Sequence, residues 1–260
     1  MQAFLLCAGL GTRLRPLTHI LPKVMMPVSG RPLLEIWLTV LEASGVTKVF
    51  INTHHMSHLI KDYVARVKFT YLEIELIYEE VLLGTAGTIS LNRDSFDSDL
   101  LVIHADNFGI FDLKPFFAFH ENNLNFDYSI MTFKTSNPNE CGIFEKDSAG
   151  MITGFEEKPR NAKSNIANSA IYIFKPKILD FIKENNLKDL SYDLIRLYYN
   201  LAALWMYEGV FFDIGNVKSL VKANKVMFEI NLPKENEWHQ EYREKFLSEI
   251  NNLVGFNNHD

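Results

Sequence analysis

The chain has 260 residues, of which 47% are hydrophobic and 22% are charged, and its formal net charge is −6. The acidic balance argues against nucleic acid as a partner, because binding to a phosphate backbone needs a basic excess. Two cysteines are too few for a disulfide framework. No apolar run approaches the length of about 18 residues that a membrane span needs. The N-terminus also lacks the charged start of a signal peptide, so we expect a cytoplasmic protein with no membrane partner.

Strands and helices alternate over the first 135 residues. Short apolar or alternating runs predict strands, and apolar residues spaced by three and four predict helices. We expect strands over 2–7, 48–52, 73–78, 100–104 and 128–133, and helices over 33–44, 56–67, 85–92 and 114–122. This alternation predicts an α/β fold with a mostly parallel, doubly wound, Rossmann-like sheet and helices on both of its faces.

The pattern changes after about residue 138. We expect short strands over 142–145, 152–156 and 169–174, helices over 176–185 and 192–200, a hairpin over 204–213 and a helix over 217–229. An amphipathic helix is expected over 237–253, where apolar residues recur at helical spacing. The second half therefore predicts a small mixed β subregion, followed by a helical tail.

A glycine-containing loop follows the first strand. Gly9 and Gly11 allow backbone N–H groups to approach an anion closely, as phosphate-binding loops require. No Gly-Lys-Ser/Thr sequence follows, which excludes a Walker loop. Leu14 occupies the third glycine position of a dinucleotide fingerprint, which makes that motif a poor match. The loop leads instead to two cations, Arg13 and Lys23, which suit a triphosphate.

The run Gly-Leu-Gly-Thr-Arg-Leu-Arg-Pro-Leu-Thr at 9–18, with Pro-Lys at 22–23, resembles the signature of the sugar-1-phosphate nucleotidyltransferases. Further segments resemble that family in the same order, at 83–87, 106–107, 142–145, 156–159 and 212–215. The resemblance covers about residues 1–231. It implies an enzyme of EC type 2.7.7 that takes a nucleoside triphosphate and a sugar 1-phosphate and releases pyrophosphate. Among its branches, the chain looks most like the mannose- or heptose-1-phosphate guanylyltransferases.

The resemblance also implies the nucleotide site, which would comprise Leu6, Ala8, Gly9, Gly11, Thr12, Arg13, Glu79, Gly84 and Thr85. Arg13, Lys23 and Asp106 would be catalytic, because positioning and charge neutralisation carry a phosphoryl transfer of this kind.

Two aspartates resemble the magnesium ligands of the family. Asp106 follows the expected strand 100–104, and Asp213 follows the apolar run 209–212. Hard carboxylate oxygens suit Mg²⁺, although an isolated aspartate at a strand end is otherwise a turn or cap residue. The family usually has glycine before the first of them, and Ala105 stands there instead. We expect only a slight local change of backbone from this departure.

The sugar-phosphate contacts implied by the resemblance are Gly142, Glu157, Lys158 and Asn168, the last of these expected ahead of the strand 169–174. A carboxylate accepts hydrogen bonds from sugar hydroxyls, and a lysine neutralises the phosphate. An ordinary turn glycine and turn asparagine are the alternatives for Gly142 and Asn168. Glu156 alternates away from Glu157 and is expected to face solvent.

The choice of base rests on Glu79. A carboxylate only accepts hydrogen bonds, which suits the N1–H and N2–H₂ donors of guanine. We therefore favour GTP, while a uridylyl-, thymidylyl- or cytidylyltransferase of the same fold remains an alternative, as does solvent exposure of Glu79 or Glu80. A catalytically silent regulatory subunit is a further alternative, although Arg13 and Lys23 are both retained.

The expected organisation is a nucleotidyltransferase domain over 1–231 and a helical tail over 232–260. Within the domain, 1–135 would serve mainly the nucleotide and 136–231 mainly the sugar phosphate. The tail lies outside the resemblance. Its apolar stripe packs either on its own domain or on a second copy, which would make a homo-oligomer.

Overall fold

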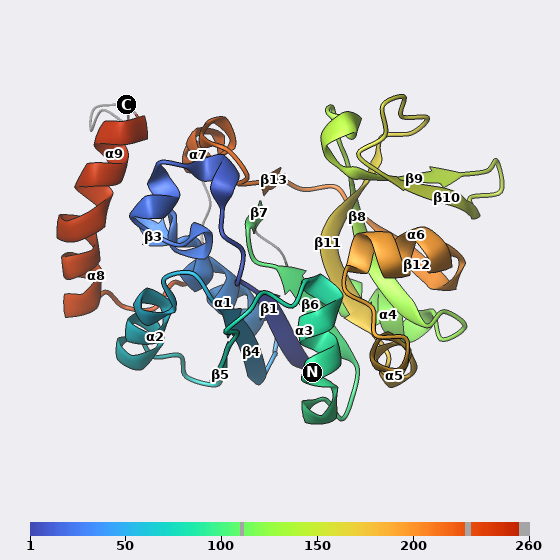
Figure 1. Ribbon diagram of the computed structural model, residues 1–260, viewed down its shortest axis with the longest axis horizontal. Coiled ribbons are helices and arrows are strands. Elements are labelled where there is room, and N and C mark those ends of the chain that lie inside the picture. The colour runs from blue at the N-terminus through green and yellow to red at the C-terminus, as the bar shows by residue number, and fades with distance from the viewer. Residues whose placement is uncertain (110–111, 227–229, 255–260) are drawn as a thin grey trace. The chain divides into compact units, whose positions relative to one another are not determined.

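The computed structural model describes residues 1–109, 112–226 and 230–254. The chain divides into two compact units, each assembled from segments that are distant in the sequence (Figure 1). The first unit contains Met1–Phe4, Leu83–Ile103 and Leu113–Gly209. The second contains Leu5–Leu82, His104–Asp112 and Val210–Asp260. Strand β1 (Gln2–Leu6) begins in the first unit and ends in the second.

The first unit has a mixed sheet. Its strands are β6 (Leu100–His104), β8 (Tyr128–Lys134), β9 (Gly142–Lys146), β10 (Ile152–Glu157), β11 (Ile166–Phe174) and β12 (Ala202–Tyr207). The strands are ordered β10-β9-β11-β6, and β8 pairs with both β11 and β12. β11 is antiparallel to β6, β8 and β9, whereas β12 is parallel to β8. The helices are α3 (Thr85–Leu91), α4 (Lys114–Asn122), α5 (Pro176–Glu184) and α6 (Arg196–Tyr198).

The second unit carries parallel strands and two small antiparallel ladders. β4 (Lys48–Thr53) is parallel to β5 (Glu73–Tyr78), and β1 lies beside β4. One ladder joins β2 (Pro27–Val28) to β3 (Arg31–Pro32), and the other joins β7 (Asn107–Gly109) to β13 (Phe211–Asp213). The helices are α1 (Leu33–Ala43), α2 (Ser57–Arg66), α7 (Val217–Asn224), α8 (Glu237–Tyr242) and α9 (Ser248–Val254).

The expected fold class is confirmed. The chain is mixed α/β, with a mostly parallel central sheet, surrounding helices and small antiparallel sheets. The strands and helices expected over the first 135 residues form with nearly the expected bounds, because long apolar runs with a clear period specify them. The mixed β subregion in the second half is likewise present.

The prediction of a hairpin over 204–213 is wrong. β12 pairs with β8 in the first unit, and β13 pairs with β7 in the second. Each strand therefore pairs with a strand that is distant in the sequence. In the β7–β13 pair, Phe212 stacks on Phe108 with ring centroids 6.3 Å apart. Local turn signals cannot reveal such long-range pairing.

Two expected helices differ in their ends. The helix expected over 192–200 begins at Leu190 with a π-helical turn, because Asp189 Oδ1 accepts the N–H groups of Ser191 and Tyr192 at 2.8 and 2.9 Å. The helix expected over 217–229 ends at Asn224, and residues 227–229 lie outside the described residues.

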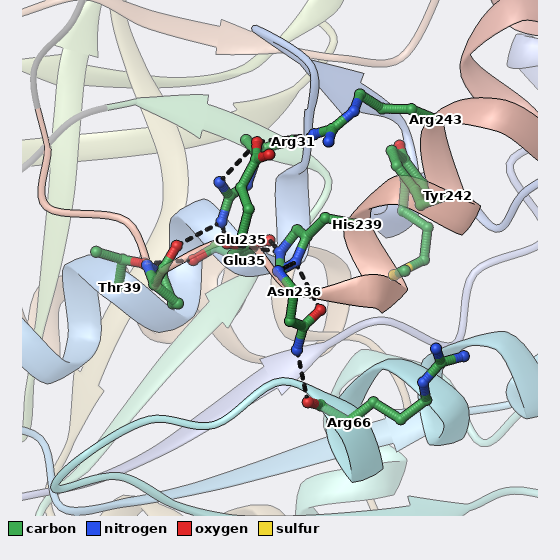
Figure 2. A network of polar contacts seen from close by, with 11 residues as sticks. Arg31, Glu35, Thr39, Arg66, Glu235, Asn236, His239, Tyr242 and Arg243 are labelled. Atoms are coloured by element: carbon green, nitrogen blue, oxygen red, sulfur yellow. Dashed lines mark hydrogen bonds and ion pairs between the residues drawn. The ribbon is translucent and has the colours of Figure 1, made fainter.

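The tail is helical from Glu237 to Val254, through α8, a π-helical turn at Arg243–Leu247 and α9. It packs on its own unit, where Trp238 meets the ring of Tyr63 edge-on at 4.9 Å. Figure 2 shows the polar network beneath it, in which the buried Glu35 of α1 lies beside Arg31 and His239. A contact with a second copy remains a prediction. Within the described residues, no helix has both the length and the apolar character needed to cross a membrane.

Candidate functional site

The loop after β1 belongs to the second unit and is fixed at both of its ends. The Cys7 N–H donates to Asn52 Oδ1 at 2.7 Å, next to the half-buried Leu6 and the buried Ala8. Further along, the Thr18 hydroxyl donates to the Gly11 carbonyl at 2.9 Å. Between these anchors the middle of the loop is open to solvent, with Gly9, Leu10, Thr12 and Arg13 exposed. Its backbone is therefore accessible to an anionic ligand.

Lys23 holds two aspartates of the same unit. Its ammonium lies 2.7 Å from Asp106 Oδ2 and 3.3 Å from Asp213 Oδ1. Arg13 lies 3.6 Å from the other oxygen of Asp213. The Lys23 side chain is 11% exposed, whereas those of Asp106 and Asp213 are 38% and 48% exposed. The cluster thus presents carboxylate oxygens to solvent while its lysine is largely enclosed.

The β7–β13 ladder explains why these aspartates meet. Asp213 pairs with Asn107 in the register of that ladder, directly beside Asp106. The Ile214 N–H then donates to the Asp106 carbonyl at 3.1 Å. Gly215 completes the arrangement, since a Cβ there would lie 2.8 Å from one Asp213 oxygen and 3.0 Å from the Arg13 guanidinium. Gly215 was not among the expected site residues, although it closes the segment 212–215 that resembles the family.

Asp106 is ionised at neutral pH. Burial by itself would raise the pKa of its carboxyl, but the charges of Lys23 and His104 and the hydrogen bond from Lys23 outweigh burial and lower that pKa. Across the described ranges, no cluster of three or more His, Cys, Asp or Glu side chains could hold a metal ion. Two partly exposed carboxylates fit Mg²⁺, which usually takes one or two carboxylates and fills its remaining positions with phosphate and water.

Glu79 is buried rather than exposed, whereas Glu80 faces solvent. Its carboxylate accepts a hydrogen bond from Asn52 Nδ2 at 2.8 Å, and the same Asn52 side chain accepts from Cys7. The Glu79 carbonyl also pairs with His54 Nδ1 at 2.9 Å. Glu79 is thus connected to the start of the glycine loop through a single asparagine.

Gly84 and Thr85 lie in the first unit, where they contact the segment before the π-helical turn. A Cβ at Gly84 would lie 2.4 Å from the Lys188 carbonyl oxygen, which accepts the Ala86 N–H at 3.0 Å. The Thr85 hydroxyl accepts the Leu190 N–H at 2.8 Å and donates to an Asp189 oxygen at 3.3 Å. The segment 83–87 therefore has a structural role, because it contacts and positions residues 188–190.

The expected sugar-phosphate residues also lie in the first unit. Glu157 ends β10 and Lys158 directly follows it, with 3.8 Å between the Lys158 ammonium and the nearer Glu157 carboxylate oxygen. A Cβ at Gly142 would lie 2.6 Å from Glu157 Oε2 and 2.5 Å from the Phe155 ring, so only glycine leaves room for both. Lys158 has a φ of 50°, in the left-handed region that non-glycine residues rarely occupy. As expected, Glu156 is exposed.

The position expected for Asn168 is corrected, because it lies inside β11 rather than ahead of a strand. β11 changes register between Asn168 and Tyr172, and Ala170 there has a φ of 58°. Asn168 Oδ1 accepts the Ala170 N–H at 2.9 Å, and its Nδ2 donates to the Tyr172 hydroxyl at 2.9 Å. This bulge fixes the orientation of the Asn168 amide.

Two further side chains join this group that the sequence did not suggest. Tyr172 holds Asn168, and Ser191 lies within hydrogen-bonding range of both Glu157 and Tyr172. Burial raises the pKa of Glu157, and the charge of Lys158 opposes that rise. No local motif marks Ser191, because its approach to Glu157 depends on the tertiary fold.

A family model described as nucleotidyl transferase matches residues 2–229. The chain belongs to this family. The match confirms the resemblance seen in the motifs, because relatives of the chain are named as sugar-1-phosphate nucleotidyltransferases. It ends before the C-terminal helices, whose residues lie outside the family model.

Two curated relatives carry different base specificities in their names. Mannose-1-phosphate guanylyltransferase catalytic subunit beta of Xenopus tropicalis is 30% identical, over 92% of this chain and 68% of its own length. Glucose-1-phosphate thymidylyltransferase of Streptomyces griseus is 28% identical, over 90% of this chain and 68% of its own. Across four curated relatives, the chain spans 55% to 68% of their length.

The fold of the chain is similar to that of a solved structure with a bound ligand. HddC from Yersinia pseudotuberculosis, complexed with GMP-PN, matches with a TM-score of 0.73 and 26% identity. The match covers 86% of this chain and 98% of that one. The chain therefore shares its fold with this solved structure.

Proposed function

We propose that this chain transfers a nucleotidyl group, preferentially from GTP, to a sugar 1-phosphate and releases pyrophosphate. The observation that carries the proposal is the bonding of Lys23 to both Asp106 and Asp213, beside the exposed glycine loop. Arg13 adds a second cation to the same cluster. A silent regulatory subunit would have no need to retain this set of charges.

In the proposed reaction, an oxygen of the sugar phosphate attacks the α-phosphorus of the triphosphate and pyrophosphate leaves. Both reactants are anions, so catalysis consists chiefly of positioning and charge neutralisation. Arg13 and Lys23 would neutralise the triphosphate, a role that suits a planar guanidinium and a mobile ammonium. The backbone of the loop at Gly9, Gly11 and Thr12 would bind phosphate oxygens through its N–H groups.

Asp106 and Asp213 would hold Mg²⁺, which supplies positive charge to the phosphate oxygens when it is bound. The low pKa of Asp106 keeps its carboxylate available as a ligand over the neutral range. Lys23, which contacts both carboxylates, would then be able to turn its ammonium toward the phosphates.

The sugar phosphate is assigned to the group around Glu157. Glu157 would accept hydrogen bonds from sugar hydroxyls, Lys158 would neutralise the phosphate, and Asn168 would offer an amide whose orientation is fixed by Tyr172. Gly142 supports this assignment through the space that it leaves for the Glu157 carboxylate.

The preference for GTP rests on the buried carboxylate of Glu79, which can only accept hydrogen bonds. The guanylyltransferase among the relatives and the GMP-containing ligand of the HddC structure support the same choice. The thymidylyltransferase relative keeps a pyrimidine nucleotide as the second candidate.

A substrate grid tests the proposal. The purified chain is incubated with Mg²⁺, each of GTP, UTP, dTTP and CTP, and each of several hexose and heptose 1-phosphates, and products are identified by mass spectrometry. We expect a GDP-sugar from GTP and one acceptor class. A product from a pyrimidine nucleotide alone would keep the enzyme class and overturn the role of Glu79. The absence of any nucleotide-sugar product would count against the proposed function.

A further inference from the structure

The C-terminal helices contact the turn that carries Lys23. Lys23 begins a 3-10 turn at Lys23–Met25, and the Tyr242 hydroxyl of α8 donates to the Met25 carbonyl at 2.8 Å. Tyr242 is 2% exposed, and its ring stacks on Trp238 with centroids 5.1 Å apart. A residue outside the family match therefore holds the backbone two positions from the lysine of the cluster.

The same helices also supply a hydrogen-bond partner to a buried carboxylate on α1. Glu35 is 0% exposed, and its carboxylate pairs with the Arg31 guanidinium and lies 3.1 Å from His239 Nε2 (Figure 2). A carboxylate only accepts hydrogen bonds, so His239 Nε2 donates to Glu35, while Nδ1 lies 3.1 Å from the Asn236 backbone N and 2.9 Å from Asn236 Oδ1. A buried carboxylate needs such partners, which fixes α8 against α1.

Helix α1 reaches the aspartate side of the cluster. The Trp37 indole N–H, two residues after Glu35, donates to the Asn107 carbonyl at 2.8 Å. Asn107 directly follows Asp106 and pairs with Asp213 in the β7–β13 ladder. Helix α8 thus contacts the Lys23 turn directly through Tyr242. Through His239 it contacts α1, which in turn bonds the backbone beside Asp106.

We propose that Tyr242 and His239 are positioning residues that hold the Lys23–Asp106 pair in its bonded geometry, so that the C-terminal helices form part of the functional unit. Tyr242 acts on the backbone of the Lys23 turn, and His239 acts on α1 through Glu35. The consequence for catalysis rests on the proposed function above. The consequence for the backbone of the Lys23 turn does not.

Tyr242→Phe and Trp238→Phe form a matched pair for the test. Tyr242→Phe removes only the hydroxyl that bonds Met25, whereas Trp238→Phe removes an indole N–H that donates to Asp62 on α2 at 2.8 Å. Each variant loses one hydrogen bond of the same helix and keeps an aromatic ring. We expect both to lose similar thermal stability. Only Tyr242→Phe should lower kcat, by about threefold to tenfold, with the KM for the sugar phosphate unchanged.

A second pair tests the route through Glu35. His239→Ala should lower kcat, and His239→Gln should restore most of it, because a glutamine amide can donate to Glu35 as Nε2 does. If Tyr242 and His239 only stabilise the fold, kcat should be unchanged in every variant at temperatures where all of them are folded. That result would contradict the proposal.

Amide hydrogen exchange gives a readout that needs no substrate. The Met25 and Met26 N–H groups bond Pro22 and Lys23 within the turn, at 2.8 and 3.1 Å. Their exchange should be faster in Tyr242→Phe than in the wild type, and in Trp238→Phe it should proceed at the wild-type rate. Equal exchange in the two variants would overturn the proposal, even if the enzyme proved active. Faster exchange in Tyr242→Phe alone would support it, even if the proposed substrates were wrong.

Discussion

Lys23 and Asp106 are 83 positions apart in the sequence, and the Lys23 ammonium lies 2.7 Å from Asp106 Oδ2. The lysine comes from a short turn after the glycine loop, whereas the aspartate follows β6. Their pairing has two effects: it keeps the carboxylate ionised, and it places a cation next to the proposed triphosphate site.

Removal of the Lys23 charge should abolish most of the activity. Lys23→Met is expected to reduce kcat about a hundredfold to a thousandfold, the usual cost of losing a group that neutralises charge in the transition state. The matched control is Lys48→Met, which removes an ammonium that bridges Glu73 and Glu75 at 3.0 Å on the surface. Steady-state kinetics of the two variants would compare them, and equal losses would contradict the role of Lys23.

Gly142→Ala should impair use of the sugar phosphate. The added methyl would collide with Phe155 and Glu157, so we expect the KM for the sugar phosphate to rise about tenfold or more, with a smaller change for the nucleotide. Gly154→Ala is the control from the neighbouring strand, since its nearest neighbour would be 4.0 Å away. An unchanged KM in Gly142→Ala would contradict the role of Gly142 in leaving space for the Glu157 carboxylate.

Glu157→Gln should stabilise the protein and weaken the enzyme. The folded pKa of Glu157 is raised, so the folded state binds the proton more tightly than the unfolded state does. Stability is therefore lost as the pH rises from the ordinary glutamate value through the raised pKa, and the whole penalty is present above that raised pKa. Thermal melting at pH 7 should show a higher Tm for the variant, with the difference vanishing in acid.

The same substitution should raise the KM for the sugar phosphate about tenfold, because the amide replaces one carboxylate acceptor. Wild-type kcat/KM for the sugar phosphate should also fall on the acid side at a higher pH than an ordinary glutamate would give. A lower Tm for Glu157→Gln at pH 7 would contradict the burial argument.

Gly84→Ala should destabilise the first unit more than its backbone conformation alone explains. Gly84 and Gly150 have φ values of 82° and 83°, but only Gly84 would place a Cβ against backbone, at 2.4 Å from the Lys188 carbonyl oxygen. We expect Gly150→Ala to cost about 1 kcal/mol and Gly84→Ala at least twice as much. Urea unfolding of both variants would measure the difference, and equal losses would show that the Lys188 segment simply moves aside.

Glu79→Gln should change the choice of base while leaving the loop intact. The glutamine oxygen can still accept from Asn52, so the connection to Cys7 is kept. The amide N–H₂ group would face the base as a donor, which suits a pyrimidine O4 better than guanine. We expect kcat/KM to fall about tenfold or more for GTP and to rise for UTP or dTTP. A uniform loss across all nucleotides would assign Glu79 a purely structural role.

Much of the fold could be predicted from the sequence, because the strands of the first half are long apolar runs with a clear period. The hairpin expected over 204–213 failed for the opposite reason, since β12 and β13 are specified by partners more than 70 positions away, such as Tyr128 and Phe108. Asn168 was placed outside its strand because the bulge in β11 interrupts the expected alternation.

In the candidate site, too, local motifs predict some residues, whereas others depend on contacts between distant parts of the chain. Motifs indicated Lys23, Asp106 and Asp213, and the structure brings these three together. The contact between Thr85 and Asp189 joins residues 104 positions apart, and no local pattern could reveal it. Tyr172 and Ser191 were missed for the same reason, as an ordinary buried tyrosine and an ordinary serine carry no signature of their own.

The most direct measurement is pyrophosphate release by the purified chain with GTP, Mg²⁺ and the best acceptor of the substrate grid, each omitted in turn. It should be made on the wild type, on Asp106→Asn and on Asp97→Asn, which alters an exposed aspartate of the first unit. We expect that release requires all three components, is lost in Asp106→Asn and is retained in Asp97→Asn. Release that persists unchanged in Asp106→Asn would contradict this expectation, as would no release with any nucleotide and sugar phosphate.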